Sequence, residues 1–428
     1  MRRPHLLAPD HHPEVRRHLP LLVGGRFASN LALRFPAPFL GVIAAGLGTS
    51  VGAMGLALSV GEFAGLAAPA VGRAADRRGA RTAMSVGLGL LAVALLTAAV
   101  APAVAVFAGA MVVVQLAKVS YDAATTSWVA DRVPFGRRAE VTGLVETSWA
   151  LALLVGIPVL GLLVDGAGWR WGLVAIASLC AAAALGVRRR LPATPGHRGE
   201  VHPDALLDEA LGGPAGPAAT AAVADAPAAT VGRAWYRIPR RSLLTLASVA
   251  LLMGAIQLVV VVEGVWFEDA FGFSTARIGG AVLFIGMAEL VGSFGSSRLT
   301  DRVGTRRSML IGCLLMLPAV AALGLIGSHA VTGIAVVAVG TLGFEFALVS
   351  AFPLVAELDV AARGTMFTLM LAAGTAMRGV ADALGPLLFS HGGIGVVGLT
   401  SAGLVAVVVV LVVLAVREPP RPERRARP

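Results

Sequence analysis

The feature that most constrains the fold of this chain is a succession of long apolar segments. A helix needs about 20 apolar residues to cross the hydrocarbon core of a bilayer. We expect such helices at approximately residues 20–46, 50–71, 82–101, 103–130, 141–164 and 169–187, and then at 243–265, 275–299, 307–327, 330–356, 365–389 and 394–416. Hydrophobic residues make up 57% of the chain and charged residues only 14%, compared with about 25% charged residues in soluble proteins. The sequence therefore predicts an all-α membrane protein with twelve transmembrane helices.

Polar segments divide these helices into two bundles of six. We expect an N-terminal tail at 1–19, a first bundle at 20–187, a linker at 188–241, a second bundle at 242–416 and a C-terminal tail at 417–428. Most of the 35 Lys and Arg residues lie in the tails, the linker and the loops after the second, fourth, eighth and tenth helices. Short basic loops remain on the cytoplasmic side of a membrane. We therefore expect a multi-pass protein of the cell membrane, a monomer with both termini and the linker in the cytoplasm.

An internal repeat relates the two bundles. A shift of 225 residues superposes residues 76–81, DRRGAR, on residues 301–306, DRVGTR, and also places Met84 on Met309 and Gly87 on Gly312. Parallel repeats of this kind are typical of transporters, in which the substrate site lies at the repeat interface. The repeat therefore predicts two copies of a six-helix unit around a shared site.

The loop at residues 72–81 resembles the signature GxxxD(R/K)xG(R/K)(R/K), which follows the second helix in the major facilitator superfamily. Residues 156–161, GIPVLG, are similar to a degenerate form of the GPxxGG element of the drug:proton antiporter branch. Two positions depart from these patterns: Ala80 stands where a basic residue is usual, and about Met111 stands where such exporters have an arginine. The resemblance implies a cavity lined by the first, fourth, seventh and tenth helices, with the second, fifth, eighth and eleventh helices at the interface between bundles.

The loop and its repeat form the gating motif that the resemblance implies. In the family, this cytoplasmic contact forms in one transport state and breaks in the other. Its candidate residues here are Gly72, Asp76, Arg77, Gly79, Arg81, Asp301, Arg302, Gly304 and Arg306.

Ionisable residues inside the predicted spans are candidates for function, because each charge there costs roughly 2.5–3.5 kcal/mol on insertion scales. Four are cations, Arg26, Arg34, Lys118 and Arg378. Seven are anions, namely Glu62, Asp122, Glu146, Glu263, Glu289, Glu345 and Asp382. Four cations cannot neutralise seven anions, and burial favours the neutral form of a carboxyl group. The surplus therefore predicts that protons are the coupling ion.

Helical spacing groups several of these side chains. Gln115, Lys118 and Asp122 share one face of the fourth span, where Lys118 and Asp122 are spaced to form an ion pair, and Arg378 and Asp382 have the same spacing. With the helix roles implied by the resemblance, we expect the substrate cavity to contain Asn30, Arg34, Gln115, Lys118, Tyr121, Asp122, Gln257, Glu263 and Glu345. The interface or the proton path should then contain Glu62, Glu146, Glu289, Arg378 and Asp382.

Two positions keep alternative interpretations. Arg26 either faces the interior or extends its long side chain to the cytoplasmic surface. Glu263 either faces the cavity or lies near the outer boundary. Trp149, one helical turn from Glu146, is more typical of packing than of a substrate contact.

These features favour secondary active transport by alternating access. The first interpretation is proton-coupled export of a small amphipathic molecule, such as a drug-like compound or a metabolite; the alternative is proton-coupled uptake of a small anionic nutrient. A membrane-embedded enzyme is disfavoured because HExxH, nucleophile-elbow and phosphate-loop motifs are absent. A channel is disfavoured because the two bundles carry different buried charges. We expect no cofactor, no metal and no nucleic-acid partner.

Overall fold

The computed structural model describes residues 13–193, 238–326, 329–359 and 363–416, and within these ranges it contains helices and no strand. The first bundle consists of α1 (Pro13–Arg34), α2 (Leu40–Gly46), α3 (Val51–Ala64), α4 (Ala68–Arg78), α5 (Ala80–Ala99), α6 (Val104–Arg132), α7 (Phe135–Leu151), α8 (Ile157–Ala167) and α9 (Trp169–Arg190). The second consists of α13 (Arg240–Phe271), α14 (Thr275–Val303), α15 (Thr305–Ile326), α16 (Ala330–Glu357) and α17 (Arg363–Ala415).

These helices supply the twelve predicted crossings. Ten helical segments are long and apolar enough to span a bilayer. One of them, within α17, holds two spans, because the backbone leaves helical geometry at Gly392 and Gly393, where φ is 64° at the second glycine. The 22-residue helix α1 supplies the remaining crossing. Helices extend slightly into both ends of the predicted linker, 188–241, because α9 continues to Arg190 and α13 begins at Arg240.

Three of the predicted spans contain an interruption of the α-helix. The first ends at Arg34, and α2 starts only after Pro36 and Pro38. The second contains a 3₁₀ turn at Gly65–Ala67, and the fifth contains a π turn at Ala152–Gly156 just before Pro158. Proline cannot donate the helical hydrogen bond and crowds the preceding turn. Near a proline the α-helix therefore ends, as at Arg34, or changes to a tighter 3₁₀ turn or a wider π turn, as in the other two spans.

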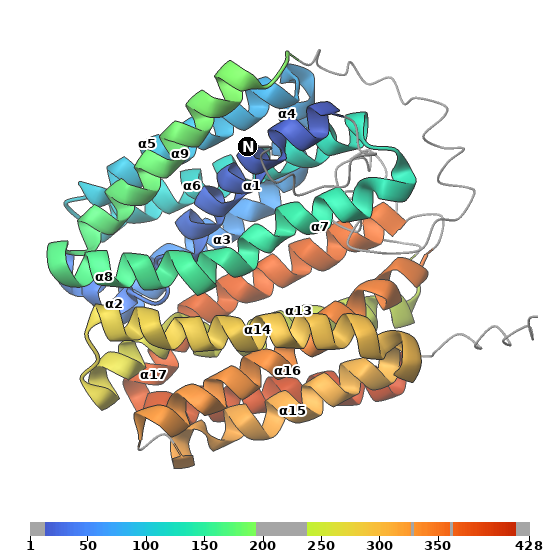
Figure 1. Cartoon of the computed structure of the whole chain (residues 1–428). Coiled ribbons are helices and arrows are strands. Elements are labelled where there is room, and N and C mark those ends of the chain that lie inside the picture. Colours follow the sequence, from blue (N-terminus) through green and yellow to red (C-terminus); the bar gives the residue numbers. More distant parts are fainter. Residues whose placement is uncertain (1–12, 194–237, 327–328, 360–362, 417–428) are drawn as a thin grey trace, which may run out of the picture.

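The two bundles lie side by side, with α1–α9 on one side and α13–α17 on the other (Figure 1). The repeat is visible in the backbone. Gly79 begins the connection into α5 at φ 78°, and Gly304, which is 225 positions later, begins the connection into α15 at φ 98°. A side chain is strained at such angles, which explains why both copies of the loop carry glycine here.

Small residues join the bundles along two helix pairs, α3 with α17 and α8 with α14. Figure 1 shows α8 and α14 running along each other. A Cβ added at Gly55 of α3 would meet the backbone oxygen of Asp382 and the ring of Pro386 in α17, and one added at Gly161 of α8 would meet Gly279 of α14. Without a hydrophobic effect between helices in lipid, close backbone packing of this kind stabilises helix association.

Candidate functional site

A partly buried ion-pair cluster joins α1, α6 and α7 within the first bundle. The guanidinium of Arg26 lies 2.5 Å from Asp122 and 2.9 Å from Glu146, and Lys118 Nζ donates to Asp122 Oδ2 at 2.6 Å. The predicted Lys118–Asp122 pair is thus confirmed. Arg26 is only 8% exposed, so its side chain faces the interior and does not extend to the surface.

A second ion pair crosses between the bundles. Arg34 of α1 donates to both carboxylate oxygens of Glu289 in α14, at 2.9 and 3.3 Å. Trp149 of α7 donates from Nε1 to Glu289 Oε1 at 2.8 Å, and the Arg34 guanidinium stacks 3.8 Å from the centre of the Trp149 ring. Bidentate pairing and cation–π contact both stabilise a guanidinium away from water. Trp149 therefore supports this ion pair, a role that the sequence pattern did not predict.

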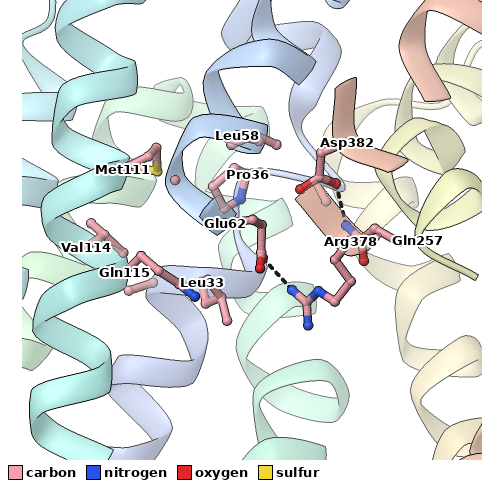
Figure 2. Close-up of a pocket in the computed structure, with 13 residues that line it drawn as sticks. Leu33, Pro36, Leu58, Glu62, Met111, Val114, Gln115, Gln257, Arg378 and Asp382 are labelled. Carbon is pink, nitrogen blue, oxygen red and sulfur yellow. Dashed lines mark hydrogen bonds and ion pairs between the residues drawn. The ribbon is translucent and has the colours of Figure 1, made fainter. Parts of the chain in front are cut away.

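A third ion pair also crosses between the bundles, at a small cavity (Figure 2). Arg378 Nη2 of α17 donates to Glu62 Oε1 of α3 at 2.6 Å. Asp382, one turn along α17, accepts a hydrogen bond from Gln257 Nε2 of α13 at 2.6 Å. The expected Arg378–Asp382 pair is therefore not the direct contact in this structure, because the partner of Arg378 lies across the interface.

Three of the seven carboxylates form no ion pair with any of the described residues, and all three lie in the second bundle. Asp382 is bound by the amide of Gln257. Glu345 accepts a hydrogen bond from Ser293 Oγ at 3.0 Å. Glu263 is 3% exposed, and its Oε2 lacks a hydrogen-bond partner. Glu263 is thus buried in the protein, where it interacts electrostatically with Arg34 and Glu289. The surplus of acid expected from the sequence resides in these three groups.

Two residues expected in the cavity instead pack inside the first bundle. Asn30 donates to Ser148 Oγ at 3.2 Å, which joins α1 to α7. Tyr121 is fully buried, and its hydroxyl donates to the carbonyl of Leu22 at 3.1 Å. Both side chains are used for contacts between helices of the same bundle. Gln115 does line the cavity shown in Figure 2.

The gating-motif residues are partly described. Arg81 donates to the carbonyl of Leu191 at 3.3 Å, and Arg306, its counterpart in the repeat, donates to the carbonyl of Val413 at 2.8 Å. Gly72 lies in α4, while Arg77 and Arg302 are exposed. The side chains of Asp76 and Asp301 lie outside the described set, so the expected carboxylate contacts remain predictions.

One interface contact has no signal in the sequence pattern. Asp165, near the end of α8, accepts hydrogen bonds from Thr275 Oγ1 at 3.1 Å and from the backbone N–H of Ala276 at 3.5 Å. A carboxylate stabilises the exposed N–H groups at a helix start, and here it comes from the opposite bundle. Only the packing of α8 on α14 reveals it.

The arrangement supports two kinds of chemistry. Carboxyl groups without a cation are suited to bind and release protons. Ion pairs that cross between bundles can form in one arrangement of the bundles and break in another. Within the described ranges, no group of three or more His, Cys, Asp or Glu side chains is placed to hold a metal ion.

Comparisons with known proteins agree with this architecture. The sequence profile of the Major Facilitator Superfamily matches residues 22–381. A curated relative, the uncharacterized MFS-type transporter YwfA of Bacillus subtilis (strain 168), is 28% identical over 165 residues, which are 37% of this chain and 40% of the relative. The match therefore spans less than half the length of that relative.

Several solved structures share the fold. A bacterial homologue of the human lysosomal transporter Spinster, solved inward-facing and unoccupied, has a TM-score of 0.68 at 14% identity, covering 94% of this chain and 96% of that one. A POT family transporter in complex with a thioalcohol-conjugated peptide has a TM-score of 0.70 at 15% identity, covering 93% and 95%. The human organic anion transporter MFSD10 (TETRAN) has a TM-score of 0.60 at 18% identity, covering 94% and 100%. At these identities the likeness shows the fold alone.

Proposed function

Because the chain belongs to the Major Facilitator Superfamily, and is thus a multi-pass membrane transporter and not an enzyme, we propose that it exports a small amphipathic molecule in exchange for protons. The finer features of this proposal are the coupling ion, the direction and the substrate class. We also propose that it acts as a monomer in the cell membrane. The positive-inside distribution supports the proposed orientation, with both termini and the linker in the cytoplasm.

The observation that carries proton coupling is the set of three carboxylates without a cation partner among the described side chains: Glu263, Glu345 and Asp382. An ionised carboxylate away from water is strongly destabilised unless it is paired. Each of these groups is therefore stable here as the neutral acid and stable in water as the anion. A transporter that alternates between buried and hydrated arrangements of such groups binds and releases protons.

The substrate class follows from the cations. Each of the four cations within the predicted spans is already held by a carboxylate: Arg26, Arg34, Lys118 and Arg378. An anionic substrate would have to displace one of those carboxylates, whereas a neutral or cationic amphipathic molecule needs no such exchange. The pairing thus favours a drug-like substrate over the small anionic nutrient of the alternative, which is proton-coupled uptake.

The transport cycle in this proposal is alternating access, in which two rigid bundles rock about a central site. The ion pairs Arg34–Glu289 and Arg378–Glu62 each join the bundles, so each has to break and form again as the bundles rock. Substrate or proton binding shifts the equilibrium between the two arrangements of the bundles only if the ligand binds one arrangement more tightly than the other.

The test is transport into vesicles that contain the purified protein, with the membrane potential clamped. Ethidium, a permanently charged amphipathic cation, is the first probe, because a pH gradient cannot trap it. An acidic vesicle interior should drive ethidium inward by exchange with protons. Fluorescein serves as the anionic probe.

Two results would contradict the proposal. Accumulation of fluorescein driven by an acidic exterior would instead support anion uptake, and ethidium movement that ignores the proton gradient would remove proton coupling. Asp269→Asn is the matched control, since Asp269 is an exposed acid at the end of α13 and should transport like the unmodified protein.

A further inference from the structure

A small cavity lies where the two bundles meet, between α1, α3, α6, α13 and α17. It encloses about 50 Å³, which is room for a few water molecules at roughly 10–15 Å³ each. The charged side chains that line it are Glu62 from α3 and Arg378 and Asp382 from α17. The other elements contribute neutral side chains, including the amides of Gln115 and Gln257 (Figure 2).

Polar atoms in this cavity are left for water. The Oε1 atom of Gln115 and the Nε atom of Arg378 are buried and have no hydrogen-bond partner among the described residues. A water molecule is stable in a buried site when it has several polar partners, and Gln115, Arg378 and Asp382 line the same cavity. Water in the cavity can therefore connect Asp382 to the ion pair that joins the bundles.

The charges in the cavity balance only when one carboxyl group carries a proton. Glu62 and Arg378 neutralise each other through their contact at 2.6 Å. Asp382 is 2% exposed and is held by the neutral amide of Gln257. Ionisation of Asp382 would place two anions beside one cation in a site of low dielectric, which is costly.

We propose that Asp382 is the proton-binding residue that couples transport to the joining of the two bundles, through competition with Glu62 for Arg378. This inference rests on the proposed proton coupling and identifies its site. In the joined arrangement Asp382 is the neutral acid and Arg378 binds Glu62.

Loss of the proton changes which carboxylate Arg378 prefers. The O–H bond of Asp382 breaks and the proton passes to cavity water, which leaves both electrons of the bond on the carboxylate oxygen. Asp382 is one helical turn from Arg378 and interacts with it electrostatically, so the guanidinium turns to the new anion within α17. Glu62 of α3 then loses its partner, and the contact across the interface weakens.

Infrared spectroscopy of the purified full-length protein tests the site with protons as the only ligand. The carbonyl band of protonated carboxylic acids should lose one component in Asp382→Asn. It should also lose that component in Glu62→Gln, although Asp382 is still present, because Arg378 is then free to pair with Asp382 as the anion. A merely structural role of Asp382 does not predict the second effect.

The matched control is Glu146→Gln, which removes an ion-paired carboxylate of the first bundle and should leave the band unchanged. A band that keeps all its components in Asp382→Asn would overturn the assignment of the proton. A band that Glu62→Gln leaves intact would overturn the competition for Arg378.

Transport separates this inference from the proposed function. Asp382→Asn should reduce ethidium accumulation driven by an acidic interior to that of protein-free vesicles. It should retain exchange of ethidium between equal concentrations on the two sides, which needs no proton. If Asp382→Asn still accumulates ethidium while Glu345→Gln does not, this inference is wrong, although transport is still coupled to protons. If the wild-type protein shows the infrared signature but no gradient-driven transport, the assignment of the proton to Asp382 stands and the proposed function is wrong.

Discussion

At the scale of single residues, the interior is organised by which carboxylates have cations and which do not. The Arg34–Glu289 pair is the most elaborate of these contacts, because both guanidinium nitrogens bind the carboxylate and Trp149 both stacks on the cation and donates to the anion. Removing one member of a buried pair leaves the other charge without compensation, whereas removing both members can be nearly neutral.

Glu289→Gln should therefore destabilise the protein by about 3–5 kcal/mol, visible as a lower unfolding temperature in scanning calorimetry of the detergent-purified protein. The double variant Arg34→Met with Glu289→Met should be affected less than the single variant, since it leaves no unpaired charge. If the unfolding temperature falls equally in the single and double variants, Glu289 does not compensate the charge of Arg34.

The sequence predicted the number of surplus acids but not their identities. Four cations and seven anions within the spans can be counted directly, and the Lys118–Asp122 pair follows from helical spacing. The partner of Arg378 could not be predicted, because spacing favoured Asp382 on the same helix while the actual partner, Glu62, lies 316 residues away. Contacts between distant helices depend on how the bundles dock, which no local pattern encodes.

At the scale of helices, small residues and prolines set the contacts of the interface. The apolar runs predicted where helices cross, because a bilayer requires a fixed length of apolar residues. They did not predict the breaks, since an apolar run continues through Pro36, Pro38 and Pro158. The π turn at Ala152–Gly156 precedes the segment in which Gly161 meets α14.

Gly161→Val should force α8 away from α14, because its side chain would meet the backbone of Thr275 and Gly279. The ensemble should shift toward the arrangement in which this pair of helices is apart. Labelling of a cysteine at Thr275 with a water-soluble thiol reagent should become faster. Gly166→Val is the control within the same helix, since an added Cβ there meets nothing within 4 Å. Equal labelling in both variants would exclude this contact as a determinant of the conformation.

At the scale of the whole molecule, two bundles of similar architecture meet along α3–α17 and α8–α14. The two bundles differ in how their acids are paired. The first bundle pairs Asp122 and Glu146 internally, through Arg26 and Lys118, and pairs Glu62 with Arg378 of the second bundle. The second bundle leaves three acids without cations in the described structure. An asymmetry in charge pairing is therefore superimposed on a repeated fold.

A covalent link between the bundles should arrest transport. A Cβ at Gly52 of α3 would lie 3.4 Å from the side chain of Leu387 in α17, so Gly52→Cys with Leu387→Cys should form a cross-link on oxidation. Transport of ethidium should stop when the link forms and return on reduction, while each single variant should be insensitive to oxidant. The native Cys180 and Cys313 are buried. Undiminished transport by the cross-linked protein would contradict a cycle in which α3 and α17 separate.

The paired contacts of Arg81 with the Leu191 carbonyl and of Arg306 with the Val413 carbonyl have a mechanical consequence. Each arginine tethers the last helix of its bundle to the third, immediately before the chain enters the linker in one case and the tail in the other. A force applied through the first residues of the linker or through the tail is passed first to one of these two pairs of helices. The other end of the linker leads directly into α13, so a pull on the linker reaches the two bundles by different routes.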